Sequence, residues 1–129
     1  MVVEYLTVVE LKVVKIVSLG NFYTLKTHKE FQSIYRKAKD AHSSSVVLFF
    51  LPTQDIKKVG FTATKKIGNA VKRNRAKRKM RALFQEYAPD LKDGTYIFVA
   101  KAAINEVSHH RFSQDFKKVI DRLKASEKR

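Results

Sequence analysis

The residues best placed to do chemistry in this chain are cations, and they gather in one stretch, 65–81, which reads KKIGNAVKRNRAKRKMR. Nine of its residues are Lys or Arg and none is acidic. A helix N-terminus carries a partial positive charge, so cations in its first turns destabilise an isolated helix through the dipole and through mutual repulsion. Bound phosphates would reverse both contributions, because free amides and cations would face the same anions. The stretch therefore favours nucleic-acid binding over a merely solvated charged face.

A helix from about Ala70 to Tyr87 is expected to position these cations. Gly68 and Asn69 are typical of a turn followed by a helix cap, and Pro89 ends the helix. Apolar residues three and four apart form one stripe that suits a core: Ala76, Met80, Leu83, Phe84 and Tyr87. Polar residues gather on the opposite side of the helical wheel: Asn74, Arg78, Arg81 and Gln85. The pattern predicts a helix with one buried face and one basic face.

Composition narrows the class of protein. The 129 residues suit one domain, and a hydrophobic content of 44% is enough for a core. The net charge of +15 points to nucleic acid or a membrane surface as the partner. The chain has no cysteine, which excludes disulfides and fits a cytoplasmic protein, and no run of 18 apolar residues that could span a membrane.

The rest of the chain predicts helices and strands in alternation. Thr27 and Glu30 have the spacing of a capping box, so a first helix is expected over 28–39. Strands are expected over 46–51, 59–64 and 95–100. Gly60 indicates a bulge or a close backbone approach, and Ser108 can cap a last helix. The order helix, strand, strand, helix, strand, helix predicts an α/β (α+β) fold with one sheet covered by helices.

Residues 1–20 form a valine-rich segment whose structure the pattern does not decide. Helix-like spacing competes there with strand-forming residues, and the charged start and cleavage site of a signal peptide are missing. We expect residues 1–20 to be an N-terminal extension, either an added element or the product of a misplaced start codon. Residues 21–129 are expected to form the single domain.

Catalytic chemistry finds little support in the sequence. The histidines are His28, His42, His109 and His110. The adjacent pair would point to different faces of a helix, which makes a poor metal site, and no nucleophile and base are suitably spaced. No catalytic residue and no metal ligand are therefore expected.

Three aromatic residues have two possible roles. Phe31 and Tyr35 share one face of the first helix, and Phe49 lies on a strand beside Phe50, so these two point to opposite faces of the sheet. Core packing explains such residues, but a basic protein with aromatic side chains beside a sheet can also stack unpaired bases. The pattern alone leaves both roles open for Phe31, Tyr35 and Phe49.

The segment from Lys58 to Arg78, KVGFTATKKIGNAVKRNRAKR, closely resembles the signature of the bacterial ribonuclease P protein subunit. That family carries a strand with R-V-G-F/L-x-V-S-K-K, then I/V-G-N-A-V, then R-N-R-x-K-R on a helix. The resemblance extends from about Asn21 to Lys124, and it includes Lys29-Glu30-Phe31 with Tyr35 on the first helix.

The resemblance implies a central mixed sheet flanked by helices, a ribosomal protein S5 domain 2-like fold, with an unusual left-handed crossover that carries the basic helix. It also implies that a catalytic RNA, not the protein, removes the 5′ leader of precursor tRNA. The Mg²⁺ of that reaction would be held by the RNA partner and the substrate. The implied partners are this catalytic RNA and precursor tRNA, with no membrane and no small-molecule substrate.

The resemblance also assigns residues by position. The expected RNA-binding residues are Lys65, Lys66, Asn69, Arg73, Asn74, Arg75, Lys77, Arg78 and Arg81. The expected leader-binding cleft comprises Phe31, Tyr35 and Phe49. The chain departs from the family pattern at Lys58, where Arg is usual, at Ala63-Thr64, where Val-Ser is usual, and after Arg81.

Three other readings compete with this one. A ribosomal protein that binds ribosomal RNA would share the size and charge. A peripheral membrane protein would need an apolar face opposite its cations, and the Met80–Tyr87 stripe could supply it. A stand-alone nuclease is disfavoured because an acid–base constellation is missing.

Overall fold

The computed structural model describes residues 22–123 and 125, and the expected extension 1–20 lies outside them. Five strands form one mixed sheet in the order β1-β4-β5-β3-β2. The strands are β1 (Tyr23–Thr24), β2 (Lys39–His42), β3 (Val46–Pro52), β4 (Lys57–Thr62) and β5 (Gly94–Ala100). The α-helices are α2 (His28–Lys37), α3 (Ala70–Tyr87) and α4 (His109–Arg122). Short 3₁₀ turns are η2 (Lys65–Ile67), η3 (Ala88–Asp90) and η4 (Ala102–Asn105).

The expected fold class is confirmed, and the structure adds two strands to the expected order. Both lie at the sheet edges, where β1 has only two residues and β2 reads KDAH, without the alternation that marks a half-buried strand. The first helix ends at Lys37, short of the expected residue 39, because Lys39 already pairs with Phe50 of β3. The capping box of Thr27 and Glu30 is confirmed, with Thr27 Oγ1 accepting from the Glu30 amide at 3.2 Å.

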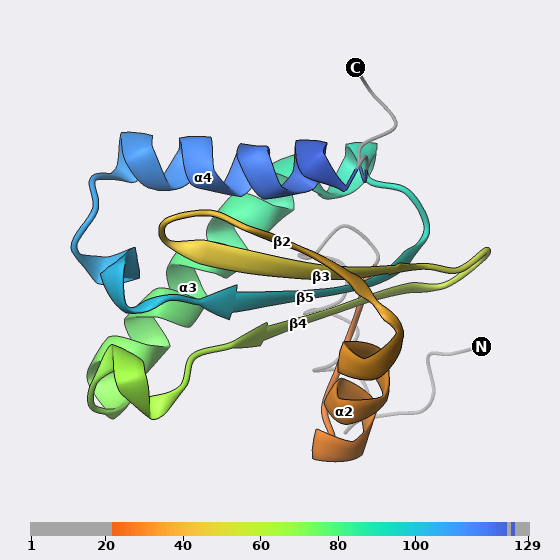
Figure 1. Ribbon diagram of the computed structural model, residues 1–129, viewed down its shortest axis with the longest axis horizontal. Helices are drawn as coiled ribbons and strands as arrows, with labels where there is room; N and C mark the ends of the chain where they lie inside the picture. The colour runs from red at the N-terminus through yellow and green to blue at the C-terminus, as the bar shows by residue number, and fades with distance from the viewer. Residues whose placement is uncertain (1–21, 124, 126–129) are drawn as a thin grey trace, which may run out of the picture.

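Alternation along the strands separates the two faces of the sheet. One face carries large buried side chains such as Phe50, Tyr96 and Phe98, and α3 and α4 cover it. There the rings of Phe98 and Phe116 stack with centroids 4.5 Å apart, and the Phe84 ring of α3 lies 5.7 Å from the Phe98 ring. The opposite face is covered by α2 alone among the described elements (Figure 1).

The connection from β4 through α3 to β5 has the left-handed sense that the resemblance implies. The two strands are adjacent and parallel. In Figure 1 both point to the left, β5 lies above β4, and α3 passes behind the sheet. A right-handed connection, the rule for such units, would place α3 in front. The crossover therefore puts the basic helix on the face opposite α2.

A buried carboxylate fastens α4 to the hairpin of β2 and β3. Asp115 is 4% exposed, and one of its oxygens accepts hydrogen bonds from Ser45 at 2.6 Å and Ser44 at 2.7 Å, while Arg111 donates to the other at 3.2 Å. Burial raises the pKa of the Asp115 carboxyl, but these hydrogen bonds outweigh that effect and lower it below its ordinary value. No local pattern in the sequence predicted this anchor.

Candidate nucleic-acid interface

The basic helix forms where the sequence predicts it. Asn69 caps α3, with its Oδ1 accepting from the Lys72 amide at 3.0 Å, and Gly68 before it has φ +134°, a value that favours glycine. The inner face of the helix is buried in the core through Ala76, Met80, Leu83 and Phe84. Because this face is fully occupied by packing, the cations must lie on the outer surface.

The outer surface of α3 carries a shallow groove of about 440 Å³. Its walls are Val71, Asn74, Lys77, Arg78 and Arg81, which recur every three or four residues along one side of the helix. The Arg81 guanidinium also lies 5.6 Å from the centroid of the Phe61 ring. We call this surface the basic face. It brings together Asn74, Lys77, Arg78 and Arg81 of the expected RNA-binding residues, while Lys65 and Lys66 are exposed on η2, just before the helix.

Hydrogen bonds to backbone carbonyls fix α3 between its start and Lys79. Arg73 donates to the Gly68 carbonyl at 2.7 Å, and Lys79 donates to the Ile104 carbonyl at 2.7 Å. The Asn105 amide donates to the Lys72 carbonyl at 3.1 Å. Arg73 therefore has a structural partner, unlike the exposed Arg75 and Arg78.

Electrostatics within the helix reflect this arrangement. Burial, and then repulsion from Arg75, lower the pKa of the Lys79 ammonium below its ordinary value. Its Nζ also lies 5.4 Å from the centroid of the Phe112 ring. Lys79 thus serves as a link between α3 and η4, which no spacing in the sequence predicted.

The expected cleft residues meet on the other face of the sheet. The Tyr35 ring lies 4.8 Å from the Phe49 ring in an edge-on arrangement, and 6.3 Å from the Phe31 ring. All three side chains are half-buried, so each keeps accessible surface. Gly60 of β4 lies directly beneath Phe31, because a Cβ there would come within 2.6 Å of the Phe31 ring. The expected close approach at Gly60 is therefore confirmed, and we call Phe31, Tyr35 and Phe49 the aromatic cleft.

Groups that could support protein-based catalysis are sparse over residues 22–123 and 125. No three His, Cys, Asp or Glu side chains gather there in a way that could hold a metal ion. His42 and Asp40 form a pair at 2.7 Å, but both are exposed on the edge strand β2. In the same part of the chain, no helix is long and apolar enough to cross a membrane.

The fold of this chain is the mixed-sheet fold seen in solved structures of bacterial RNase P proteins. A mutant of the Staphylococcus aureus RNase P protein superposes with a TM-score of 0.73 at 26% identity, covering 80% of this chain and 89% of that one. The RNase P protein from Thermotoga maritima superposes with a TM-score of 0.67 at 19% identity, covering 77% of this chain and 96% of that one.

Sequence comparison then gives the family. The Ribonuclease P family model matches residues 19–124. A ribonuclease P protein component from Nitratiruptor sp. is 44% identical over 101 residues, which is 78% of this chain and 92% of that protein. One from Streptococcus pyogenes is 31% identical over 107 residues, which is 82% of this chain and 90% of that protein. The chain belongs to the ribonuclease P protein family.

Proposed function

We propose that this chain is the protein subunit of a ribonucleoprotein ribonuclease P. In this proposal the basic face of α3, with Lys65, Lys66, Asn69, Arg73 and Arg75 beside it, binds the catalytic RNA. The aromatic cleft binds the 5′ leader of precursor tRNA. The observation that carries the proposal is the separation of a cationic helix and an aromatic cleft onto opposite faces of one sheet in a member of this family.

The basic face suits a folded RNA because it offers charge on a rigid support. Arg75 and Arg78 are exposed, and the helix that carries them is fixed by its buried stripe. Phosphates are bound by such cations without regard to base sequence, and the affinity falls as salt rises. The oxygen of Asn69 already serves as the helix cap, so its contact with RNA would come from the amide NH₂.

The aromatic cleft suits an unpaired strand because it offers ring surface with little charge. Bases of single-stranded RNA stack on aromatic side chains with modest dependence on sequence. Phe31, Tyr35 and Phe49 leave part of their rings accessible, as such stacking requires. The 5′ leader is a single-stranded part of precursor tRNA, which makes it the proposed occupant.

The cleavage itself is assigned to the RNA partner. We propose that the Mg²⁺ of the reaction is held by the catalytic RNA and the substrate. Among the described residues, no three His, Cys, Asp or Glu side chains gather in a way that could hold a metal ion. The protein's own residues would bind and orient both RNAs. Because both proposed partners are cytoplasmic in bacteria, the cytoplasm is the proposed location.

Reconstitution tests the proposal. The full chain is combined with a bacterial ribonuclease P RNA and precursor tRNA at low millimolar Mg²⁺, with protein alone, RNA alone and a ribosomal RNA fragment in place of the catalytic RNA as controls. We expect cleavage at the mature 5′ end only when the catalytic RNA is present, and stimulation by the protein. Cleavage by RNA-free protein that survives repurification, or binding to the ribosomal fragment alone, contradicts the proposal.

A further inference from the structure

The outward side of α4 carries a shallow groove of about 610 Å³ that takes no part in the core. The residues that line it are all exposed, and we call them the α4 surface: Gln114, Lys117, Lys118, Asp121 and Arg122. The buried side of the helix is made of other residues, namely Phe112, Asp115, Phe116, Val119 and Ile120. Because these residues alone hold α4 against the sheet, the α4 surface is available to a partner.

The α4 surface repeats the chemistry of the basic face of α3. Each carries one side-chain amide and then two cations, three and four residues further on, a spacing that places them on one side of a helix. These residues are Asn74, Lys77 and Arg78 on α3, and Gln114, Lys117 and Lys118 on α4. An arginine follows on each helix, Arg81 on α3 and Arg122 on α4. The α4 surface therefore offers the donors that phosphate oxygens accept from.

A hydrogen bond to the β2–β3 hairpin fixes the arginine of the α4 surface. Arg122 Nη1 donates to the His42 carbonyl of the edge strand β2 at 3.1 Å. This bond uses one of the N–H donors of the guanidinium and leaves the others for a ligand. An arginine held in this way loses less conformational freedom when it binds a phosphate with two parallel hydrogen bonds. The position of Arg122 is therefore set before any RNA binds.

The lysines of the α4 surface have no ionic partner among the described residues. The ion pairs in that part of the chain are His42 with Asp40, Lys57 with Asp93, and Arg111 with Asp115. Asp121 lies one helical turn after Lys117, yet the two form no ion pair. The α4 surface holds three positive charges against one negative charge, a net charge of +2. An excess of this sign attracts a polyanion.

We propose that the α4 surface binds the phosphate backbone of a second segment of the catalytic RNA, beside the segment bound by the basic face. The catalytic RNA is the chosen partner because α3 and α4 cover the same face of the sheet, so one folded RNA can reach both (Figure 1). The two helices also touch, since the rings of Tyr87 and Phe116 stack with centroids 5.7 Å apart. The inference rests on the proposed function for the identity of this RNA.

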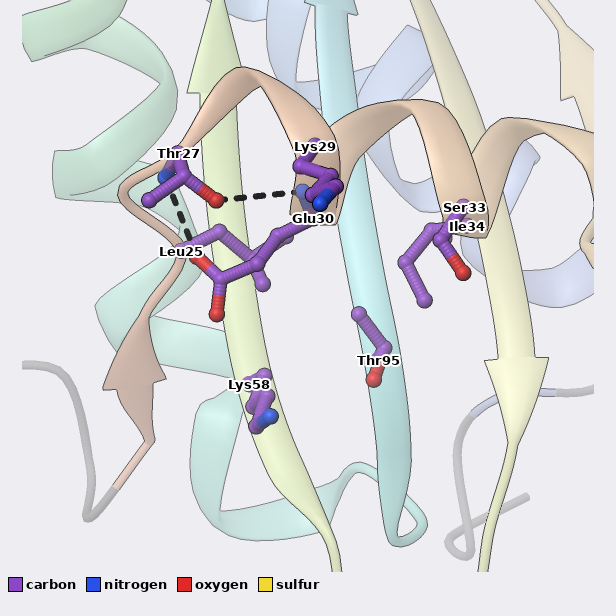
Figure 2. Close-up of a pocket in the computed structure, with 8 residues that line it drawn as sticks. All are labelled: Leu25, Thr27, Lys29, Glu30, Ser33, Ile34, Lys58 and Thr95. Atoms are coloured by element: carbon purple, nitrogen blue, oxygen red, sulfur yellow. Dashed lines mark hydrogen bonds between the residues drawn. The ribbon is translucent and has the colours of Figure 1, made fainter.

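The leader is assigned to the other face of the sheet. Figure 2 shows that face, where α2 crosses β4 and β5 and a groove is lined by residues such as Lys29 and Lys58. No residue of α4 lines this groove. A leader bound under α2 and an RNA bound on α4 would therefore lie on opposite sides of the sheet.

Asp121 provides a test that a purely structural role cannot imitate. Its carboxylate lies within the α4 surface and repels phosphate. Asp121→Asn keeps the shape and removes the charge, so the affinity for the catalytic RNA should increase severalfold. Asp55→Asn is the matched control, because it makes the same change in charge in the turn between β3 and β4. Asp55 has a φ of 62°, which Asn also tolerates, so this variant should fold and leave the affinity unchanged.

Filter binding of the full chain to a bacterial ribonuclease P RNA over a range of salt concentrations measures the contacts. Lys118→Gln and Arg122→Gln should each weaken binding severalfold and reduce the slope of log K against log salt by about 0.7–0.9, as expected for one lost phosphate contact. Lys92→Gln, an exposed lysine between η3 and β5, is the control for both. Thermal melts establish that each variant folds.

Lysine acetylation followed by mass spectrometry locates the contact. Lys117 and Lys118 should be protected when the chain is bound to the catalytic RNA, whereas Lys92 should react as in the free protein. An unchanged affinity in Lys118→Gln or in Asp121→Asn overturns the inference. Equal effects on a ribosomal RNA fragment, or effects on precursor tRNA alone, also overturn it. If Arg75→Ala binds the catalytic RNA like the wild type while Asp121→Asn binds it more tightly, the basic face fails and the α4 surface remains.

Discussion

The helices α3 and α2 pack against the same sheet, but they bury very different numbers of side chains. The inner face of α3 is buried through four side chains, including Met80 and Phe84 at 0% exposure, whereas α2 has no buried residue along its length. Buried apolar area is the main source of stability, so α3 is held firmly and α2 lightly. The tightly packed helix α3 carries the cations, and the loosely packed helix α2 carries the rings of Phe31 and Tyr35. Under the proposed function, this contrast teaches that a surface for a folded RNA is built on the core, and that a surface for a flexible strand is built outside it.

The largest expected effect tests the difference in anchoring. Phe84→Ala should lower the free energy of unfolding by about 3–5 kcal/mol, because the ring is fully buried among Phe22, Phe61 and Phe98. Tyr35→Ala should cost about half of that or less, because the ring is only half-buried. Urea unfolding followed by circular dichroism measures both. Equal losses would remove the contrast between the two helices.

A pH series tests how much the Asp115 carboxylate of α4 stabilises its attachment to the β2–β3 hairpin, which carries Phe49. The pKa of Asp115 is lowered in the folded protein, so its contribution to stability is present at neutral pH. The Asp115 carboxyl has a higher pKa in the unfolded protein than in the folded one. Its contribution to stability is therefore lost as the pH falls from the unfolded-state pKa through the folded-state pKa. Asp115→Asn should cost about 1.5–3 kcal/mol at pH 7, since hydrogen bonds to a charged group are weakened. The variant should also lose less stability than wild type between pH 6 and acid, which thermal melts would detect.

Substitutions in the aromatic cleft test whether its rings bind the leader. Phe31→Ala and Tyr35→Ala should each reduce the preference for leader-bearing over leaderless tRNA by about 1–3 kcal/mol, the value of one base stack. The salt dependence of binding should hardly change, because no charge is removed. If the variants fold normally and keep the preference for leader-bearing tRNA, the two rings serve packing and do not bind the leader.

Gly60→Ala offers a matched control for that experiment because it moves Phe31 without deleting it. The added methyl group would lie 2.6 Å from the end of the Phe31 ring, so the ring must shift. We expect the leader preference to weaken as in Phe31→Ala, while affinity for the catalytic RNA stays the same. An unchanged leader preference would show that the position of Phe31 does not matter.

Substitutions near the basic face should change the salt dependence of RNA binding, in contrast to substitutions in the aromatic cleft. Arg75→Ala and Arg78→Ala should each weaken binding to the catalytic RNA and reduce the slope of log K against log salt by about 0.7–0.9, as expected for one lost phosphate contact. Arg73→Ala should also lower the melting temperature, because this side chain donates to the Gly68 carbonyl. Filter binding between 50 and 300 mM salt gives the slopes, with Lys92→Ala between η3 and β5 as the charge-matched control.

The smallest effect is expected from removing residues 1–20. The basic face and the aromatic cleft both lie downstream, and the family match begins at residue 19. We therefore predict that residues 21–129 form the working domain, with RNA binding and leader preference close to those of the full chain. A truncated protein that fails to melt cooperatively would contradict this prediction.

The sequence predicted the parts of the fold that have strong local signals. The α3 boundaries at Ala70 and Tyr87 match because a cap, a long apolar stripe and Pro89 act together. The two edge strands escaped prediction because a strand of two residues and a polar strand such as KDAH have no periodicity to read.

Long-range contacts escaped prediction for a different reason. The hydrogen bonds from Lys79 to Ile104 and from Ser45 to Asp115 join residues 25 and 70 positions apart. Such bonds depend on the tertiary path of the chain, and no local pattern encodes them. For the site, residue types and spacing suggested the cations and the aromatic residues, but only the fold separates them onto two faces. The left-handed sense of the crossover, which causes that separation, came from resemblance and not from any rule of chain geometry.

The carbonyl bonds made by Arg73, Lys79 and Asn105 have a thermodynamic consequence for RNA binding. A helix with cations in its first turns would fray as an isolated peptide, and it would have to order when it bound. Here that ordering is complete before RNA arrives, so association carries little conformational entropy cost at α3. With a rise of 1.5 Å per residue, Arg75 and Arg81 stay about 9 Å apart along the axis. Under the proposed function, the helix thus presents its cations at a fixed spacing, and an RNA binds tightly only when the spacing of its phosphates matches.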